Sequence, residues 1–384
     1  MRNLKTGLAL IFIVALTAGC LESQPTPDIT KRPSTDFTLV EIQSALESPW
    51  SVAEMPDNTG YIVTEKGGTL WHVKGVNKKT EIRGLPDDIY VAGQGGLLDV
   101  VLASDFLETN EIYISYSYGS RDDNGTALLR ARLEGDELEN VIVIFRASPP
   151  KAAASHFGGK IVFLPDETLV LSLGDGFAYR EDAQKGDTHL GKLVRLARDG
   201  GVPQDNPYIG KSKDGLDFKP QIYSIGHRNV QGLTYDAKSD TLWEHEHGPR
   251  GGDELNRIEA GQNYGWPLAT TGLDYQGARI SPYKTFEGMV DPVHDWVPSI
   301  APSGLIIYRG DQFPEWEGDA LIGGLASRDL RRVDLENGKS VGEESLLSDL
   351  NGRVRDVRLA ADGGVLVLIE DSENGRLLKL LPKD

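Results

Sequence analysis

The chain has 384 residues, of which 58 are acidic and 40 are basic, so its formal net charge is −18. Nonspecific nucleic-acid binding needs a basic face, and this composition disfavours that class of protein. A single cysteine rules out an intramolecular disulfide and any metal site built from several cysteines. The 44 glycines and 20 prolines follow no fixed period and predict many tight turns.

Residues 1–19 have the pattern of a signal peptide. Arg2 and Lys5 form a positively charged start, and residues 8–18 form an apolar stretch too short for a permanent membrane-spanning helix. The only cysteine, Cys20, follows this stretch almost directly. The pattern resembles a bacterial lipobox, in which this cysteine is lipidated. A plain secretory signal with a chance cysteine is the alternative.

Residues 20–36 contain three prolines among serine, threonine and glutamine, which predicts an extended tether. Leu21 follows the cysteine, and by resemblance to enterobacterial sorting signals a residue other than aspartate there implies the outer membrane. We therefore expect an exported, periplasmic protein that contacts the membrane only through its lipid. The folded domain should span residues 37–384, with residues 41–46 compatible with a short helix.

A turn rich in aspartate or glycine, followed by an alternating apolar run, recurs six times along the chain. The six apolar runs are residues 61–64, 112–116, 169–173, 242–243, 320–322 and 365–368. Six repeats of roughly 58 residues suit four-stranded blades, because radial repetition protects sheet edges. The pattern predicts an all-β fold, a six-bladed β-propeller of four-stranded antiparallel sheets. A β-sandwich with a second domain is the alternative.

The longest intervals between repeats, at residues 174–235 and 249–318, are where we expect functional loops. His156 lies beside a glycine pair just before a predicted strand, where a ligand could approach closely. A histidine of an ordinary surface loop is the alternative. His245 and His247 would share one strand face and could hold zinc, but no third ligand is evident from the spacing.

Residues 248–256 combine glycine and proline with Asp253, Glu254 and Asn256. Exposed carbonyls and hard side-chain oxygens suit calcium, although an acidic turn without metal has the same composition. Two arginine groups also stand out, at residues 226–229 and at Arg353 with Arg355, which share a face if they lie on a strand. Such pairs suit carboxylates or phosphates, and surface salt bridges are the alternative reading.

Together these stretches resemble the glucose/sorbosone dehydrogenase family, soluble quinoproteins that use pyrroloquinoline quinone (PQQ), and most nearly its aldose sugar dehydrogenases. The motifs that carry the resemblance are residues 93–100 (GQGGLLDV), 156–159 (HFGG), 191–195 (GKLVR), 226–229 (GHRN), 246–254 (EHGPRGGDE), 263–267 (NYGWP) and 353–357 (RVRDV). The resemblance runs from about residue 49 to the C-terminus and implies a six-bladed propeller.

The resemblance implies the roles of the catalytic and cofactor residues. His156 matches the general base that takes the proton of the anomeric hydroxyl, and Arg228 matches the arginine where negative charge develops on the quinone. The remaining cofactor-contacting positions are Gln94, Asn229, Arg353 and Arg355, with His156 and Arg228 in contact as well. The two arginines near the C-terminus would meet the carboxylates of PQQ.

The resemblance also implies the metal and substrate residues. The backbone carbonyls of Gly248 and Pro249 match the protein ligands of the calcium that holds PQQ. Glu254 and Tyr264 match a second, structural calcium site. Trp296 is expected in the wall on the sugar side, with Gln94 also facing the substrate.

Two positions depart from the family pattern. Ser155 stands where the glucose dehydrogenase of the family has an aspartate that would orient or tune the imidazole. Ala326 stands near the place of a lysine that contacts PQQ in some members, and Arg328 is the nearest basic side chain in the sequence.

The expected activity is PQQ- and calcium-dependent oxidation of aldose sugars to lactones, with electrons passed to an external acceptor. A calcium-dependent lactonase is the enzymatic alternative, and a propeller that only binds glycan or protein is the other. The two paired arginines favour an anionic cofactor and thus the dehydrogenase. The sequence leaves monomer and dimer open.

Overall fold

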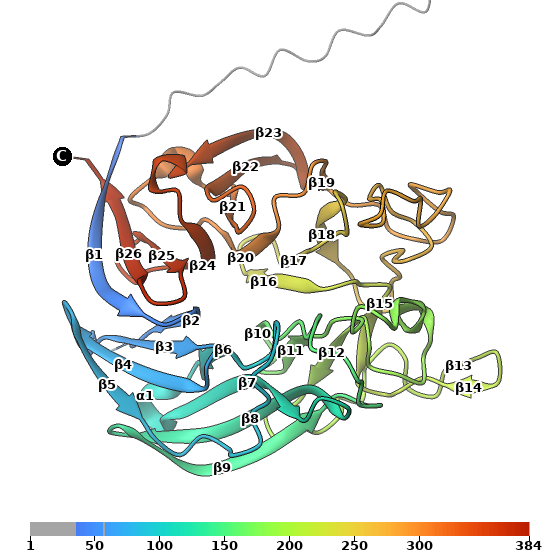
Figure 1. Ribbon diagram of the computed structural model, residues 1–384, viewed down its shortest axis with the longest axis horizontal. Helices are drawn as coiled ribbons and strands as arrows, with labels where there is room; N and C mark the ends of the chain where they lie inside the picture. Colours follow the sequence, from blue (N-terminus) through green and yellow to red (C-terminus); the bar gives the residue numbers. More distant parts are fainter. Residues whose placement is uncertain (1–35, 57, 384) are drawn as a thin grey trace, which may run out of the picture.

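Six four-stranded antiparallel sheets surround a central axis in the computed structural model of the chain, which describes residues 36–56 and 58–383 (Figure 1). The predicted six-bladed propeller is confirmed. The predicted signal peptide, the lipidation of Cys20 and nearly all of the tether lie outside the described residues. Within the described part, no helix combines the length and apolarity that crossing a membrane would need.

The strands follow one another around the ring, four to a blade. The first three blades contain β2 (Pro49–Glu54), β3 (Tyr61–Glu65), β4 (Thr69–Gly75) and β5 (Lys78–Ile82); β6 (Leu97–Leu102), β7 (Glu111–Gly119), β8 (Asn124–Glu134) and β9 (Glu137–Arg146); and β10 (Ile161–Phe163), β11 (Leu169–Ser172), β12 (Lys192–Leu196) and β15 (Ile222–Ile225). The other three contain β16 (Val230–Asp236), β17 (Thr241–Glu246), β18 (Asp253–Ile258) and β19 (His294–Trp296); β20 (Pro302–Ile307), β21 (Ala320–Gly324), β22 (Leu330–Glu336) and β23 (Lys339–Leu346); and β24 (Arg353–Leu359), β25 (Val365–Glu370), β26 (Gly375–Pro382) and β1 (Phe37–Leu46).

The remaining elements are short and lie outside the blades. They are α1 (Phe106–Thr109), the 3-10 turns Arg180–Gln184, Pro314–Trp316 and Ser348–Leu350, and a hairpin of β13 (Ser212–Lys213) with β14 (Leu216–Asp217). Each apolar run of the sequence repeat corresponds to the second strand of a blade, because that strand is covered on both faces by neighbouring blades.

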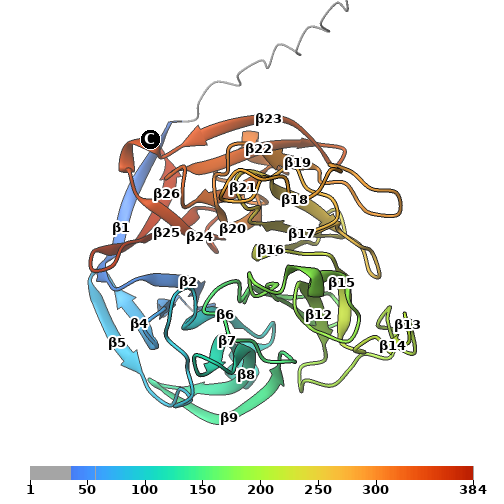
Figure 2. The same cartoon turned by 45° about the vertical axis from the view of Figure 1, so that its right-hand side comes forward.

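The N-terminal strand closes the ring. β1 pairs antiparallel with β26, from Phe37 opposite Pro382 to Leu46 opposite Gly375, so the two ends of the chain share the last blade (Figure 2). The short helix considered for residues 41–46 is therefore wrong. A partner strand more than 300 residues away overrides the local pattern.

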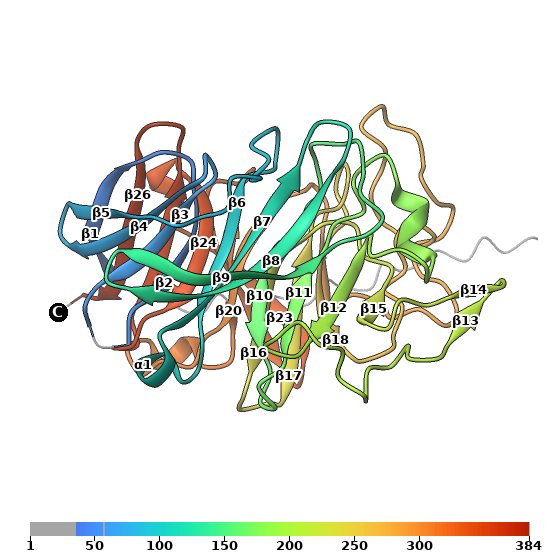
Figure 3. The same ribbon diagram turned by 90° about the horizontal axis from the view of Figure 1, so that it is seen from below.

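The core lies between adjacent blades. Ile62 and Leu70 of the first blade pack with Leu97, Ile112 and other fully buried residues of the second, and similar clusters fill the next interfaces. The connection between β18 and β19 extends beyond the sheet edges at one end of the ring (Figure 3). This connection and the loops after β11 and β17 carry much of the site described next.

Candidate functional site

His156 forms a hydrogen-bonded pair with Asp175. The distance from Nδ1 of the imidazole to the nearer carboxylate oxygen is 2.6 Å, and both side chains are buried. His156 comes from the loop before β10, and Asp175 follows β11 of the same blade. The backbone of His156 has a left-handed φ of 52°, and the backbone N–H of this residue donates to the side-chain oxygen of Gln94 at 2.7 Å.

The carboxylate of Asp175 is oriented by two further donors. Trp266 donates its indole Nε1–H to one oxygen at 2.8 Å, and the backbone N–H of Phe177 donates to the other at 2.7 Å. Because these groups can only donate, the carboxyl oxygens act as acceptors, and Nδ1 of His156 carries the proton between the pair. Nε2 is then the basic nitrogen of the ring.

Burial lowers the pKa of His156 below its ordinary value. The hydrogen bond to Asp175 opposes this change, and the positive charge of Arg228 adds to it. The imidazole is therefore neutral near pH 7, which is the state that a general base requires.

Arg228 is fixed beside this pair by the loop after β17. Its Nη1 donates to the carbonyls of His247 at 2.8 Å and Gly248 at 2.7 Å, and its backbone N–H donates to Glu246 at 2.8 Å. The backbone carbonyl of Arg228 accepts the N–H of Asp175 at 2.8 Å. The histidine, the carboxylate and the guanidinium thus belong to one hydrogen-bonded unit.

A cavity of about 300 Å³ lies on the axis of the propeller, because residues from all six blades line it. Four of the predicted cofactor residues meet there: Gln94, Asn229, Arg353 and Arg355. The lining also includes Trp50, Leu98 and Phe157 as apolar surface, and Lys66 and Glu370 as charged groups.

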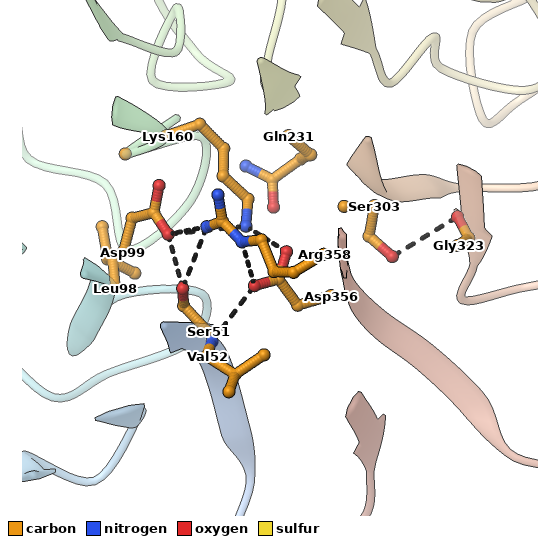
Figure 4. Close-up of polar contacts among 12 residues, drawn as sticks. Ser51, Val52, Leu98, Asp99, Lys160, Gln231, Ser303, Gly323, Asp356 and Arg358 are labelled. Carbon is orange, nitrogen blue, oxygen red and sulfur yellow. Dashed lines mark hydrogen bonds and ion pairs between the residues drawn. The ribbon is translucent and has the colours of Figure 1, made fainter. Parts of the chain in front are cut away.

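A buried ionic network lies at the core of the ring, among the inner strands (Figure 4). Lys160 donates to Asp356 at 2.7 Å, and Arg358 donates to Asp356 at 3.0 Å and to Asp99 at 2.5 Å. Ser51 donates to Asp99 at 2.5 Å. Two cations and two carboxylates balance, so the network satisfies its own charges, and Lys160 also lies 4.5 Å from the ring of Trp50 in the cavity wall.

The axial cavity fits an anionic cofactor. Arg353 and Arg355 both contact the carboxylate of Glu370, at 3.3 Å and 2.6 Å, so both guanidinium groups are aimed at one place. Lys66 adds a third positive charge to the lining against the single negative charge of Glu370. A net positive cavity in a chain of charge −18 matches a ligand with several carboxylates.

The turn after β17 fits the predicted calcium ligands. Gly248 N–H donates to Asp253 at 2.8 Å, and a side chain at Gly248 would collide with Gly252 backbone atoms 2.2 Å away. The turn is therefore fixed in a form that only glycine permits. The Gly248 carbonyl accepts from Arg228 and keeps a second lone pair, and Pro249 lines a second cavity together with Arg228.

The second predicted metal site lies in a buried acidic cluster that the sequence reading reached only in part. Glu254 pairs with Glu246 across β17 and β18, and Glu244 lies on the same face of β17 as Glu246. Potential ligand atoms of His227, Glu244 and Glu246 all lie within 4.8 Å of one another. Tyr264 stacks on His227 at 4.9 Å, while its hydroxyl donates to a backbone carbonyl.

Several atoms of this cluster have no hydrogen-bond partner among the described residues, namely His227 Nδ1, Glu244 Oε2 and Asn256 Oδ1. Burial raises the pKa values of Glu244 and Glu254 well above their ordinary value, and the nearby Glu246 raises both further. Buried acceptors without donors are the surroundings that a cation would satisfy. A hard cation would satisfy these buried acceptors, so the cluster fits a cation site.

Some predicted residues are not brought to the cavities. Trp296 is buried in β19, where its indole donates to Glu343 at 2.9 Å, and it lines neither cavity. Arg328 binds Asn351 at 3.0 Å instead of reaching the axial cavity. His245 lines neither cavity and contacts the Gly304 carbonyl of β20 at 3.0 Å. His247 does line the axial cavity, and its Nε2 contacts the Pro302 carbonyl of the same strand at 2.7 Å.

The sequence reading missed Asp175, Lys66 and Glu370. Asp175 lies between two glycines directly after a predicted strand, and that setting at a strand end was an available signal. With Asp175 as the carboxylate partner of His156, an acid at position 155 is not needed to orient the imidazole. Lys66 and Glu370 had no local signal, because only the ring closure brings them to the axis.

The chain is a six-bladed propeller with a buried histidine–carboxylate pair beside a cationic axial cavity. A neutral histidine next to a ligand-sized cavity is typical of enzymes that use a general base. The sequence narrows this class to one family: residues 46–379 match the family described as Glucose / Sorbosone dehydrogenase, and the chain belongs to that family.

Relatives with stated activities support the same assignment. The chain is 40% identical to the aldose sugar dehydrogenase YliI of Escherichia coli, over 89% of this chain and 92% of that protein. It is 26% identical to quinoprotein glucose dehydrogenase B of Acinetobacter calcoaceticus, over 95% and 92%. The PQQ-bound structure of an aldose sugar dehydrogenase from Streptomyces coelicolor superposes with a TM-score of 0.73 at 26% identity, covering 91% of this chain and all of that one. These relatives are described as sugar dehydrogenases, which supports the assignment of this chain to the oxidoreductases.

Proposed function

We propose that this protein oxidises aldose sugars at the anomeric carbon to lactones, using PQQ and calcium, and passes the electrons to an external acceptor. The observation that carries the proposal is the neutral, Asp175-bound His156 within one hydrogen-bonded unit with Arg228, beside a cationic cavity. The relatives described as quinoprotein and PQQ-bound support the choice of cofactor.

The residues divide the work as follows. His156 takes the proton of the anomeric hydroxyl on Nε2, while Asp175 holds the proton on Nδ1 and stabilises the imidazolium that forms. The left-handed backbone of His156, fixed by Gln94, sets the direction of the ring. Bound PQQ supplies the acceptor for the hydride that leaves the anomeric carbon.

Charge on the cofactor is met by fixed groups of this chain. Arg353, Arg355 and Lys66 would bind its carboxylates in the axial cavity, with Asn229 and Gln94 as hydrogen-bonding neighbours. Arg228 lies where negative charge would develop, and the carbonyls of Gly248 and Pro249 would hold the calcium ion. A second cation would occupy the acidic cluster of Glu244, Glu246 and Glu254, beside the imidazole of His227 on which Tyr264 stacks.

We further propose that the protein is exported and that a lipid on Cys20 anchors it to the outer membrane. This rests on the sequence pattern of residues 1–20. Mass measurement of the mature N-terminus, with and without mutation of Cys20, tests it.

The test of the reaction is a kinetic isotope effect. With PQQ and calcium added, an aldose deuterated at C1 should turn over several-fold more slowly than the unlabelled sugar, and the product should be the lactone. Equal rates under conditions where chemistry limits turnover would contradict hydride loss from C1.

The lactonase alternative predicts a different result from the same protein. It should hydrolyse an aldonolactone with calcium alone and show no dependence on PQQ. Comparison of lactone hydrolysis and dye reduction in one preparation separates the two activities.

A further inference from the structure

Phe177 occupies a strained position at the active site. Its backbone φ is +64°, a left-handed conformation that costs energy for a bulky residue. The N–H of Phe177 is held by the carboxylate of Asp175 at 2.7 Å, the same carboxylate that orients His156. The strain therefore arises within the catalytic unit.

This strain does not serve the packing of the core. Phe177 remains 52% exposed, with its ring edge-on to the imidazole of His156 at 5.2 Å between ring centroids. An exposed aromatic ring gains little from the hydrophobic effect, so burial does not explain why the backbone tolerates this conformation. Strained residues of this kind gather at ligand-binding positions.

A second exposed aromatic residue faces Phe177. Tyr275, 58% exposed in the connection between β18 and β19, lies with its ring 6.2 Å from that of Phe177 at an interplanar angle of 26°. Its hydroxyl is 3.3 Å from Nη2 of Arg228. The tyrosine is thus tied to the same hydrogen-bonded unit as the base.

Both rings line a cavity of about 440 Å³ that also contains Arg228, Pro249 and Trp266. The outer lining is polar, with Arg180, Asp274 and Gln276. A pyranose ring has an apolar face of C–H groups and a rim of hydroxyls, and this cavity offers an aromatic wall and a polar rim.

We propose that Phe177 and Tyr275 form the aromatic wall that binds the sugar ring and sets aldose affinity, the part that the sequence reading gave to Trp296. This inference rests on the proposed function. The two residues bind substrate, whereas PQQ and calcium are held by other residues.

The test uses Phe177→Ala and Tyr275→Ala in protein loaded with PQQ and calcium, with Phe286→Ala as the control. Phe286 is an exposed aromatic of the same connection but does not line this cavity. Each wall variant should raise the KM for aldose roughly 2- to 12-fold, the range for loss of one aromatic contact. The KM for the dye acceptor and the PQQ affinity should stay unchanged, and Phe286→Ala should alter none of these quantities.

Phe177→Gly adds a readout that a purely structural role would not produce. It should raise the aldose KM as Phe177→Ala does, yet have a higher Tm than Phe177→Ala, because glycine adopts the left-handed conformation freely.

An unchanged aldose KM in active wall variants, or a change in the acceptor KM alone, would overturn this inference and leave the proposed function intact. A wild-type protein that reduces no dye after loading would overturn both. The two failures are therefore distinguishable.

Discussion

The carboxylate of Asp175 connects most of the residues at the reaction centre. It accepts hydrogen bonds from His156, Trp266 and Phe177. Loss of the Asp175 charge should leave the loops in place. The imidazole of His156, however, would no longer be held in the tautomer that carries its proton on Nδ1. In the proposed mechanism Asp175 thus acts through His156, as a positioning residue.

Asp175→Asn should lower kcat by about 10²- to 10⁴-fold, the range for losing the group that fixes a catalytic histidine. PQQ affinity should change little, whereas the Tm should fall, because one carboxylate oxygen becomes an NH2 group that faces a buried donor, either Trp266 Nε1–H or the N–H groups of His156 and Phe177. Steady-state kinetics and PQQ titration check both parts. A kcat within a few-fold of wild type would show that Asp175 does not support the base.

The fall of kcat/KM for aldose on the acid side of its pH profile should report the protonation of His156. Because burial holds the pKa of His156 below its ordinary value of about 6.5, the base stays neutral as the pH falls through 6.5. The kcat/KM for aldose should therefore remain near its plateau at pH 6.5 and decline only at lower pH. A stability check at each pH separates titration from unfolding, and a midpoint above 6.5 would contradict the account.

The motifs that carry the family resemblance were enough to name His156, Arg228 and the two arginines of β24 as candidate site residues, because each lies in a distinctive local sequence. Trp296 shows the limit of that approach. The local sequence around Trp296 is compatible with a cavity wall and with the hydrophobic core. Only the packing of β19 shows that this side chain belongs to the core.

At the scale of elements, β1 is the strand on which ring closure depends. Leu46 at its end is fully buried among residues of the first and last blades, whereas Val40 on the same strand is exposed. The two positions allow the contribution of burial to be compared within one strand.

Leu46→Ala should destabilise the protein by about 2–5 kcal/mol, as for other buried leucines. Val40→Ala, the matched control, should change stability by less than about 0.5 kcal/mol. Denaturant unfolding of the mature domain measures both. Equal effects would mean that closure does not depend on the buried side of β1.

The second strand of every blade could be predicted, because its alternating or continuous apolar run is visible locally. β1 could not, since its strand conformation depends on β26 at the opposite end of the chain. The short helix read into residues 41–46 failed for this reason.

At the scale of the molecule, the proposed cation binding would be linked to the protonation of the cluster of Glu244, Glu246 and Glu254. Burial raises their pKa values, so the folded, cation-free protein holds protons that the unfolded chain releases. That contribution to stability is full below the ordinary glutamate pKa and is lost as pH rises through the raised values. A bound cation replaces those protons.

The rise in Tm on adding calcium should therefore be larger at pH 8 than at pH 5. Glu246→Gln should reduce both the rise and its pH dependence. Differential scanning calorimetry with calcium and with chelator measures the effect. If the rise in Tm on adding calcium were the same at both pH values, the ion would bind away from these carboxylates.

The most direct test of the account is a titration of metal-free mature protein with PQQ, with and without calcium, followed by aldose-dependent reduction of a dye. We predict saturable PQQ binding near one equivalent and sugar oxidation only when both PQQ and calcium are present. A folded, calcium-loaded protein that binds no PQQ would contradict the central claim and favour the lactonase reading of the same site.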